Sequence, residues 1–85
     1  MTKTMKEIHS KISENIMRLR REKGMTQEKL ANEIDCSQAF INQIETRAKD
    51  CNVEHIYKIS SVLECSIYDI LPDTKLDMEN TNDNN

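Results

Sequence analysis

The chain has 85 residues, a formal net charge of −3 and a charged fraction of 32%, which suits one small domain. A core of this size buries only about 60–65% of the unfolded surface, and with two Tyr, one Phe and no Trp it must be filled by aliphatic side chains. One Gly and one Pro are too few for a fold rich in β-turns. Because no apolar run is long enough for a membrane span or a secretory signal, we expect a cytoplasmic protein without membrane contact.

The charges are distributed unevenly along the chain. A negative net charge argues against unspecific binding to nucleic acid. However, residues 1–23 carry more Lys and Arg than Glu, whereas residues 72–85 hold one Lys among four acids. The excess acid therefore lies partly in the C-terminal segment, and a nucleic-acid-binding surface elsewhere is not excluded.

The first predicted helix has apolar residues at spacings of three and four, the pattern of a helix with one buried face. These residues are Met5, Ile8, Ile12, Ile16 and Leu19. Thr4 and Glu7 have the spacing of a capping box, so the helix begins near residue 5. Gly24 ends it, after a basic run that suits a helix C-terminus. Residues 1–11 are predicted to form a helical extension of the core, which is either solvated or in contact with a partner subunit.

Residues 26–47 contain two short helical patterns separated by about three residues. Thr26 and Ser37 are good N-caps for these helices, and Thr26 and Gln27 lie where backbone N–H groups suit a phosphate. The outward face of the second helix consists of short polar side chains, rich in amides, that suit base edges in a DNA groove. Its residues are Ser37, Gln38, Ala39, Asn42, Gln43 and Thr46.

Three further side chains near this segment carry specific predictions. Phe40 is expected to pack at the edge of the core rather than to stand exposed. Arg20 and Glu45 are expected to form a structural ion pair between the first and third helices, which would also hold Arg20 near a phosphate. Asp35 is expected at the end of the second helix, where Asp tolerates a left-handed backbone.

The rest of the chain predicts two more helices and a tail. Asn52 caps a fourth helix with aliphatic residues at core spacing, and Ser66 opens a short fifth helix that Pro72 ends. Residues 72–85 are acidic and rich in Asn, and they are predicted to form a disordered tail because they cannot bury enough apolar surface. Leu76 and Met78, its apolar residues, would suit a segment that folds on a protein partner.

The cysteines and histidines give no sign of a catalytic or metal site. Cys36, Cys51 and Cys65 are an odd number without a C-x-x-C pair, so we expect reduced thiols that pack as small apolar side chains. His9 and His55 are isolated and are expected at solvated helix positions. With no nucleophile–base pair, glycine-rich loop or metal-ligand set, we expect no enzyme activity and no cofactor.

Residues 12–71 resemble the phage Cro/repressor-type, or Xre-like, helix-turn-helix family. The resemblance is carried by the first-helix residues Ile12, Ile16, Leu19, Arg20 and Gly24; by MTQEKLA at 25–31; by Ser37, Ile41, Ile44 and Glu45; and by Val53, Ile56, Ile59, Leu63 and SIYDIL at 66–71. It implies an all-α, five-helix, lambda-repressor-like DNA-binding domain with the helix-turn-helix at helices two and three.

The resemblance also implies roles for individual residues. Base contacts fall to Ser37, Gln38, Ala39, Asn42 and Gln43, and phosphate contacts to Arg20, Thr26, Gln27, Thr46, Arg47 and Lys49. The family usually has Gly where this chain has Asp35, Arg47 and Glu64, so we expect altered turns or some loss of stability at these positions.

The predicted function is sequence-specific binding of double-stranded DNA by a homodimer at a palindromic operator, with repression as the simplest output. The predicted dimer surface is the fifth helix, with Ile67, Tyr68, Ile70 and Leu71. The alternative from another class is an antitoxin or adaptor that uses the same fold to bind a protein partner, through the acidic tail or the last two helices.

Overall fold

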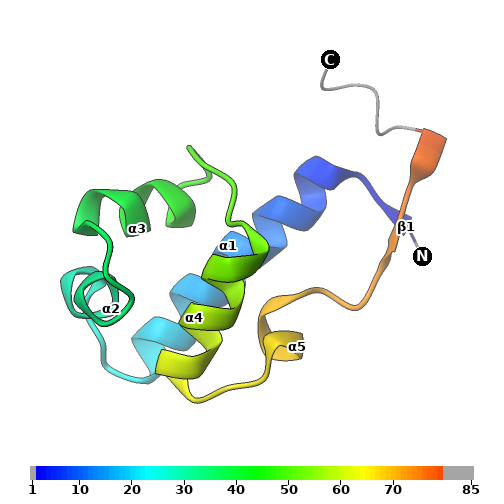
Figure 1. The fold of residues 1–85 in the computed structure, drawn as a ribbon. Helices are drawn as coiled ribbons and strands as arrows, with labels where there is room; N and C mark the ends of the chain where they lie inside the picture. Colours follow the sequence, from blue (N-terminus) through cyan, green and yellow to red (C-terminus); the bar gives the residue numbers. More distant parts are fainter. Residues whose placement is uncertain (1, 80–85) are drawn as a thin grey trace.

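The computed structural model describes residues 2–79, which form five helices and two short strands (Figure 1). The helices are α1 (Met5–Glu22), α2 (Gln27–Glu33), α3 (Gln38–Glu45), α4 (Val53–Leu63) and α5 (Ile67–Ile70), and the strands are β1 (Thr2–Lys3) and β2 (Lys75–Leu76). The predicted all-α, five-helix domain with a helix-turn-helix at α2 and α3 is confirmed.

Each helix begins at the cap that the sequence predicted. The side chains of Thr4, Thr26, Ser37, Asn52 and Ser66 all accept a hydrogen bond from a backbone N–H in the first turn of the helix that follows. The first and last of these belong to complete capping boxes. A cap of this kind stabilises a helix by typically about 1 kcal/mol, which matters for helices as short as α2 and α5.

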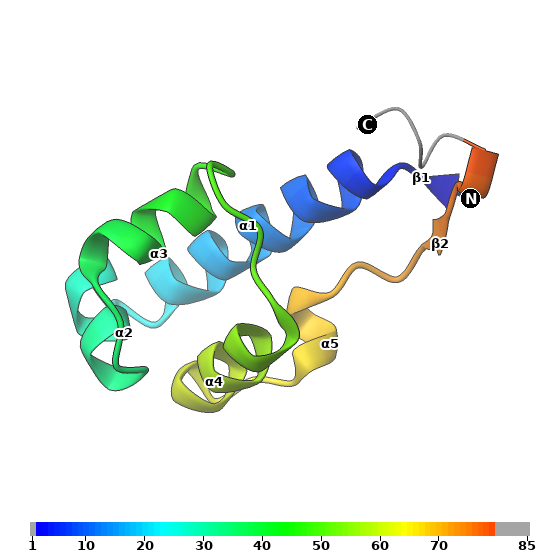
Figure 2. The same cartoon turned by 45° about the horizontal axis from the view of Figure 1, so that its top comes forward.

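The core is aliphatic and lies between α1 and the other four helices. Its buried apolar residues are Ile12, Ile16, Leu30, Ala31, Ile34, Ile41, Ile44, Cys51, Ile56, Ile59, Leu63 and Ile70. One polar contact is built into it: the Asn15 side chain donates a 2.8 Å hydrogen bond from Nδ2 to the carbonyl of Ile70 and so ties α5 to α1. Figure 2 shows α1 extending well past α3 at its N-terminal end.

Helices α1 to α4 each end with a residue in the left-handed region of φ. These residues are Gly24 (φ 69°), Asp35 (φ 58°), Arg47 (φ 68°) and Glu64 (φ 55°). After α2, the N–H of Asp35 donates to Asn32 and that of Cys36 donates to Ala31, which is the hydrogen-bond pair of a Schellman motif. The turns therefore keep the shape that Gly would give. Of the two expected consequences, altered turns or some loss of stability, the first is not found and the second stays a prediction.

The two strands differ from the sequence prediction. They pair in parallel, with Thr2 opposite Lys75 and Lys3 opposite Leu76, and the N–H of Asp77 donates a 2.8 Å hydrogen bond to the carbonyl of Lys3. Residues 75–77 are thus paired through the backbone with the N-terminal segment, which a prediction based on apolar burial does not detect. Residues 80–85 of the predicted disordered tail lie outside the described residues.

Within residues 2–79, no helix combines the length and the apolar character that a membrane span requires.

Replacing Asp35 by Gly should stabilise the domain by about 0.5–1 kcal/mol. A left-handed residue with a Cβ costs roughly 1–2 kcal/mol, part of which Gly returns as extra entropy in the unfolded chain. Urea unfolding followed by circular dichroism measures the change. The control is Asn32→Gly, at an exposed position within α2, which should lower the free energy of unfolding by a similar amount. If Asp35→Gly lowers it equally, the left-handed residue is not the source of strain.

Candidate nucleic-acid interface

The outward face of α3 is formed by the residues that the sequence singled out. Ile41, Ile44 and Glu45 are buried against the rest of the domain. On the other side of the helix, Ser37, Gln38, Ala39, Asn42 and Thr46 are exposed and Gln43 is half-buried. The structure therefore brings all the predicted base-contacting residues to one open helix surface.

Gln27, at the start of α2, connects this surface to the core. Its Nε2 donates to Glu45 Oε1 at 3.0 Å and to Asn42 Oδ1 at 3.3 Å, and its Oε1 accepts from Gln38 Nε2 at 2.6 Å. A flexible amide is thereby fixed on both sides. The contacts to Gln38 and Asn42 join the start of α2 to α3, and the contact to Glu45, which was not predicted, joins it to the core.

This network orients Gln38 before any DNA is present. One N–H of its amide points to Gln27, which leaves the second N–H and the Oε1 atom for another partner. That pair of groups matches the N7 acceptor and N6 donor of adenine. A side chain held in this way loses less rotamer entropy when it binds.

Glu45 is in turn fixed by Arg20, as predicted. Arg20 Nε and Nη2 donate to the two carboxylate oxygens of Glu45 at 2.7 and 2.9 Å, and Nη1 donates to the carbonyl of Met25 at 2.7 Å. Both residues are 8% exposed. The hydrogen bonds with Glu45 raise the pKa of Arg20 above its ordinary value, so the guanidinium stays charged. Its two hydrogen bonds to the Glu45 carboxylate fix α1 against α3.

Arg20 was expected to contact a DNA phosphate as well as Glu45. Three of its five N–H groups bind protein atoms and its side chain is 9% exposed, while Arg20 also lines a surface hollow with Thr26, Gln27 and Gln38. Its contacts in the structure orient Glu45, and the phosphate contact stays a prediction.

The other predicted phosphate contacts lie at two ends of the helix-turn-helix. Thr26 and Gln27 stand at the N-terminus of α2, which favours anions. Thr46, Arg47 and Lys49 follow the C-terminal end of α3. The Arg47 guanidinium contacts α1, because its Nη1 donates a 2.8 Å hydrogen bond to Ser10 Oγ.

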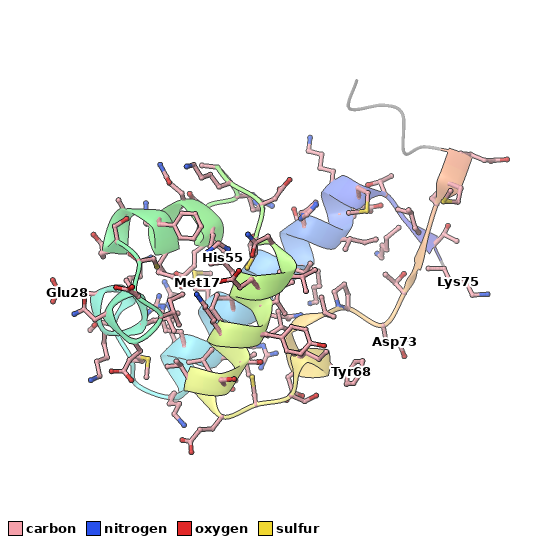
Figure 3. The ribbon with its side chains drawn as sticks, viewed as in Figure 1. Met17, Glu28, His55, Tyr68, Asp73 and Lys75 are labelled. Atoms are coloured by element: carbon pink, nitrogen blue, oxygen red, sulfur yellow. The ribbon has the colours of Figure 1, made fainter. Side chains whose placement is uncertain are left out.

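Phe40 packs as predicted, but its neighbour corrects the prediction for His55. The two rings lie 4.8 Å apart, Phe40 is packed against the core, and the Lys49 ammonium lies 5.8 Å from the Phe40 ring centroid. Among the described residues, His55 Nδ1 is buried without a hydrogen-bond partner, so His55 is not at a solvated position. Figure 3 shows its side chain between α4 and α3.

The cysteines pack as the sequence predicted. Cys51 is buried in the core, and Cys36 and Cys65 are half-buried and packed against it. Burial raises the pKa of the Cys51 thiol to about 12, so this side chain stays protonated at neutral pH and behaves as an apolar group.

The predicted dimer residues do not all reach the surface. Tyr68 is 79% exposed, and Figure 3 shows it projecting from α5 on the side away from α3. Ile67 and Leu71 are half-buried. Ile70 is wholly buried in the core, because the single turn of α5 directs this side chain toward α1. Ile70 therefore cannot contact a second subunit.

A helix-turn-helix family model, HTH_3, matches residues 16–70. The chain belongs to this Cro/repressor-type helix-turn-helix family. No curated protein matches the chain significantly by sequence.

Among solved structures, the fold is similar to that of the restriction-modification controller protein C.Esp1396I, with 36% identity, 69% of this chain and 77% of that chain covered, and a TM-score of 0.66. An HTH_3 family transcriptional regulator from Vibrio cholerae has 26% identity, covers 75% of this chain and 36% of that chain, and gives a TM-score of 0.70. The controller protein C.AhdI from Aeromonas hydrophila, at 21% identity, coverages of 74% and 91% and a TM-score of 0.70, shows likeness of fold alone. This is a family of transcriptional regulators that bind double-stranded DNA and is not an enzyme family.

Replacing Glu45 by Gln should destabilise the domain by about 3–5 kcal/mol, because it leaves the buried Arg20 charge without a counter-ion. The matched control is Glu22→Gln, which breaks the exposed Arg18–Glu22 pair and should cost at most about 0.5 kcal/mol. The double variant Arg20→Met, Glu45→Leu should recover most of the loss. Urea unfolding compares the variants, and equal costs for Glu45→Gln and Glu22→Gln would refute the assignment.

Proposed function

We propose that this protein is a sequence-specific repressor that binds a palindromic operator as a homodimer, with one α3 helix in the major groove of each half-site. The observation that carries the proposal is the fixed amide network of Gln27, Gln38 and Asn42, which lies on the exposed face of α3 and is anchored to Glu45. A core-anchored network of exposed amides has no purpose in packing, whereas it suits the reading of base edges.

In this proposal the residues of α3 divide by the kind of contact they make. Gln38 binds adenine through its remaining N–H and Oε1, and the Ala39 methyl contacts a thymine methyl. Ser37, Asn42 and Gln43 make the other base contacts. Each good bidentate contact discriminates against a wrong base by about 1–3 kcal/mol.

Phosphate contacts position the helix on the duplex and come from both ends of the helix-turn-helix. Thr26 and Gln27, at the N-terminus of α2, bind a phosphate of the DNA backbone. Thr46, Arg47 and Lys49, which follow the C-terminal end of α3, bind further backbone phosphates. Because few of these groups are cations and the net charge is −3, we expect a salt dependence weaker than that of strongly basic DNA-binding proteins.

A homodimer is proposed because one α3 helix makes too few contacts for tight binding. Two helices about 34 Å apart, one turn of DNA, double the contacts at a palindrome. The exposed Tyr68, flanked by the half-buried Ile67 and Leu71, supplies an apolar patch on α5 for the second subunit. Occlusion of a promoter by this dimer is the simplest form of repression, and the similarity to a restriction-modification controller protein supports a role in gene control.

Selection of duplexes from a random library should enrich a palindrome that contains adenine opposite Gln38. Gln38→Ala should then relax the preference at that base pair by about 1–3 kcal/mol, measured with operator duplexes that differ at this position alone. Asn32→Ala, an exposed position of α2 away from this face, serves as the control and should leave the preference intact. Failure to enrich any duplex would reject the proposal and favour a protein-binding role for the fold.

Tyr68→Asp should shift the protein from dimer to monomer in sedimentation equilibrium and reduce operator affinity at fixed concentration. The physical reason is the cost of burying an unpaired carboxylate in an interface. Tyr57→Asp on α4, which changes a tyrosine that is also exposed (55%), is the matched control and should stay dimeric. Monomerisation by the Tyr57 variant alone would move the interface to α4.

A further inference from the structure

We propose that the N-terminal end of α1 and the loop after α3 together form a second DNA-backbone site, which binds a phosphate outside the bases that α3 reads. We call it the phosphate groove. It is a surface groove of about 590 Å³ lined by Met5, Lys6, His9, Ser10, Arg47 and Asp50. The inference rests on the proposed function and extends it, because the helix-turn-helix itself does not include residues 5–10.

The groove adjoins the DNA-binding face directly. Arg47 lines the groove. It follows directly after Thr46, which caps the C-terminal end of α3. Residues 6, 10, 13 and 17 recur at helical spacing. A second hollow, lined on α1 by Ser10, Ser13, Glu14 and Met17 and on the other side by Glu45, Thr46 and Arg47, shows that this stripe of α1 faces the end of α3. The overhanging part of α1 thus continues the same side of the molecule beyond the recognition helix (Figure 2).

Two contacts fix the walls of the groove. Ser10 Oγ accepts the 2.8 Å hydrogen bond from Arg47 Nη1, so this guanidinium lies along α1. His9 Nδ1 lies 3.5 Å from Asp50 Oδ1, which joins the neighbouring residue of α1 to the end of the loop. The shape of the groove is therefore set in the free protein, and its cations need little reordering to bind.

The charges of the groove suit an anion. Lys6 and Arg47 supply two cations, and Lys6 forms no ion pair with any residue of the described part of the chain. Asp50 is the one acid in the lining, and its carboxylate is adjacent to His9. An unpaired ammonium beside an oriented guanidinium is a typical contact for a phosphate oxygen.

The pairing of β1 with β2 explains how a helix overhang can serve as a rigid contact. Thr2 and Lys3 are held by Lys75 and Leu76, and α1 starts directly afterwards with a complete capping box at Thr4. The first turn of α1 is therefore anchored at both ends rather than frayed. This gives a function to residues 1–11 that neither a solvated extension nor a subunit contact supplies.

The test measures binding of the full chain to its selected operator by fluorescence anisotropy over a range of salt concentrations. Lys6→Ala should lower the slope of log K against log [salt] by about 1 per subunit, or about 2 for the dimer, and weaken all sequences alike. Asp50→Asn should bind more tightly, since it removes a like charge from a phosphate. Lys11→Ala and Asp73→Asn, which change exposed charges outside the lining of the groove, are the matched controls and should change neither quantity.

A second arm varies the DNA. Wild-type protein should lose affinity when base pairs flanking each half-site are trimmed, and Lys6→Ala should be insensitive to the trimming. Equal slopes for Lys6→Ala and Lys11→Ala, with wild-type binding intact, would overturn the phosphate groove while leaving the proposed function in place. If the wild-type protein selects no operator, the proposed function itself fails. Thermal unfolding of both Lys variants should match the wild type, which separates lost contacts from lost folding.

Discussion

The buried ion pair between Arg20 and Glu45 is the constraint on which the DNA-binding face depends. Buried pairs of this kind are rarely a net gain over apolar residues of the same size, so stability alone does not account for its presence. Its geometric effect is clearer. With both carboxylate oxygens of Glu45 held by Arg20, Oε1 has a fixed position from which it accepts the Gln27 amide, and Gln27 then positions Gln38. A charge pair in the core thus decides where an amide on the surface points.

Much of this arrangement could be predicted because it is local in sequence. The N-caps, the apolar stripes and the ends of the helices depend on residues within a few positions of one another, and all five caps stand where the sequence placed them. The Arg20–Glu45 pair is a long-range contact, but it follows from the register of two helices whose crossing the family resemblance fixes.

The wrong or missed predictions have a shared physical origin. Each of them concerns how one element is oriented against another in the tertiary structure. From the sequence, Ile70 fits an apolar dimer surface as well as it fits the core. Only the orientation of α5 against α1 shows that Ile70 is buried. His55 was assigned to solvent because no sequence pattern shows the ring of Phe40 beside it. The link from Gln27 to Glu45 and the pairing of β1 with β2 were missed for the same reason. At Asp35, Arg47 and Glu64 the tertiary structure keeps the left-handed backbone although the residue type resists it, which shows that packing overrides a local preference worth about 1 kcal/mol.

The parallel pairing of β1 with β2 also differs from the core in how readily it opens. It joins residues more than seventy positions apart in the chain, but the hydrogen bond of Asn15 with Ile70 in the core already brings the two ends of the chain together. It contains few backbone hydrogen bonds and little apolar burial, which are the marks of a region that opens before the rest of a protein unfolds. The molecule thus contains one easily opened strand pair at its periphery and a cooperative centre around Arg20, and amide hydrogen exchange would distinguish the two by their degree of protection.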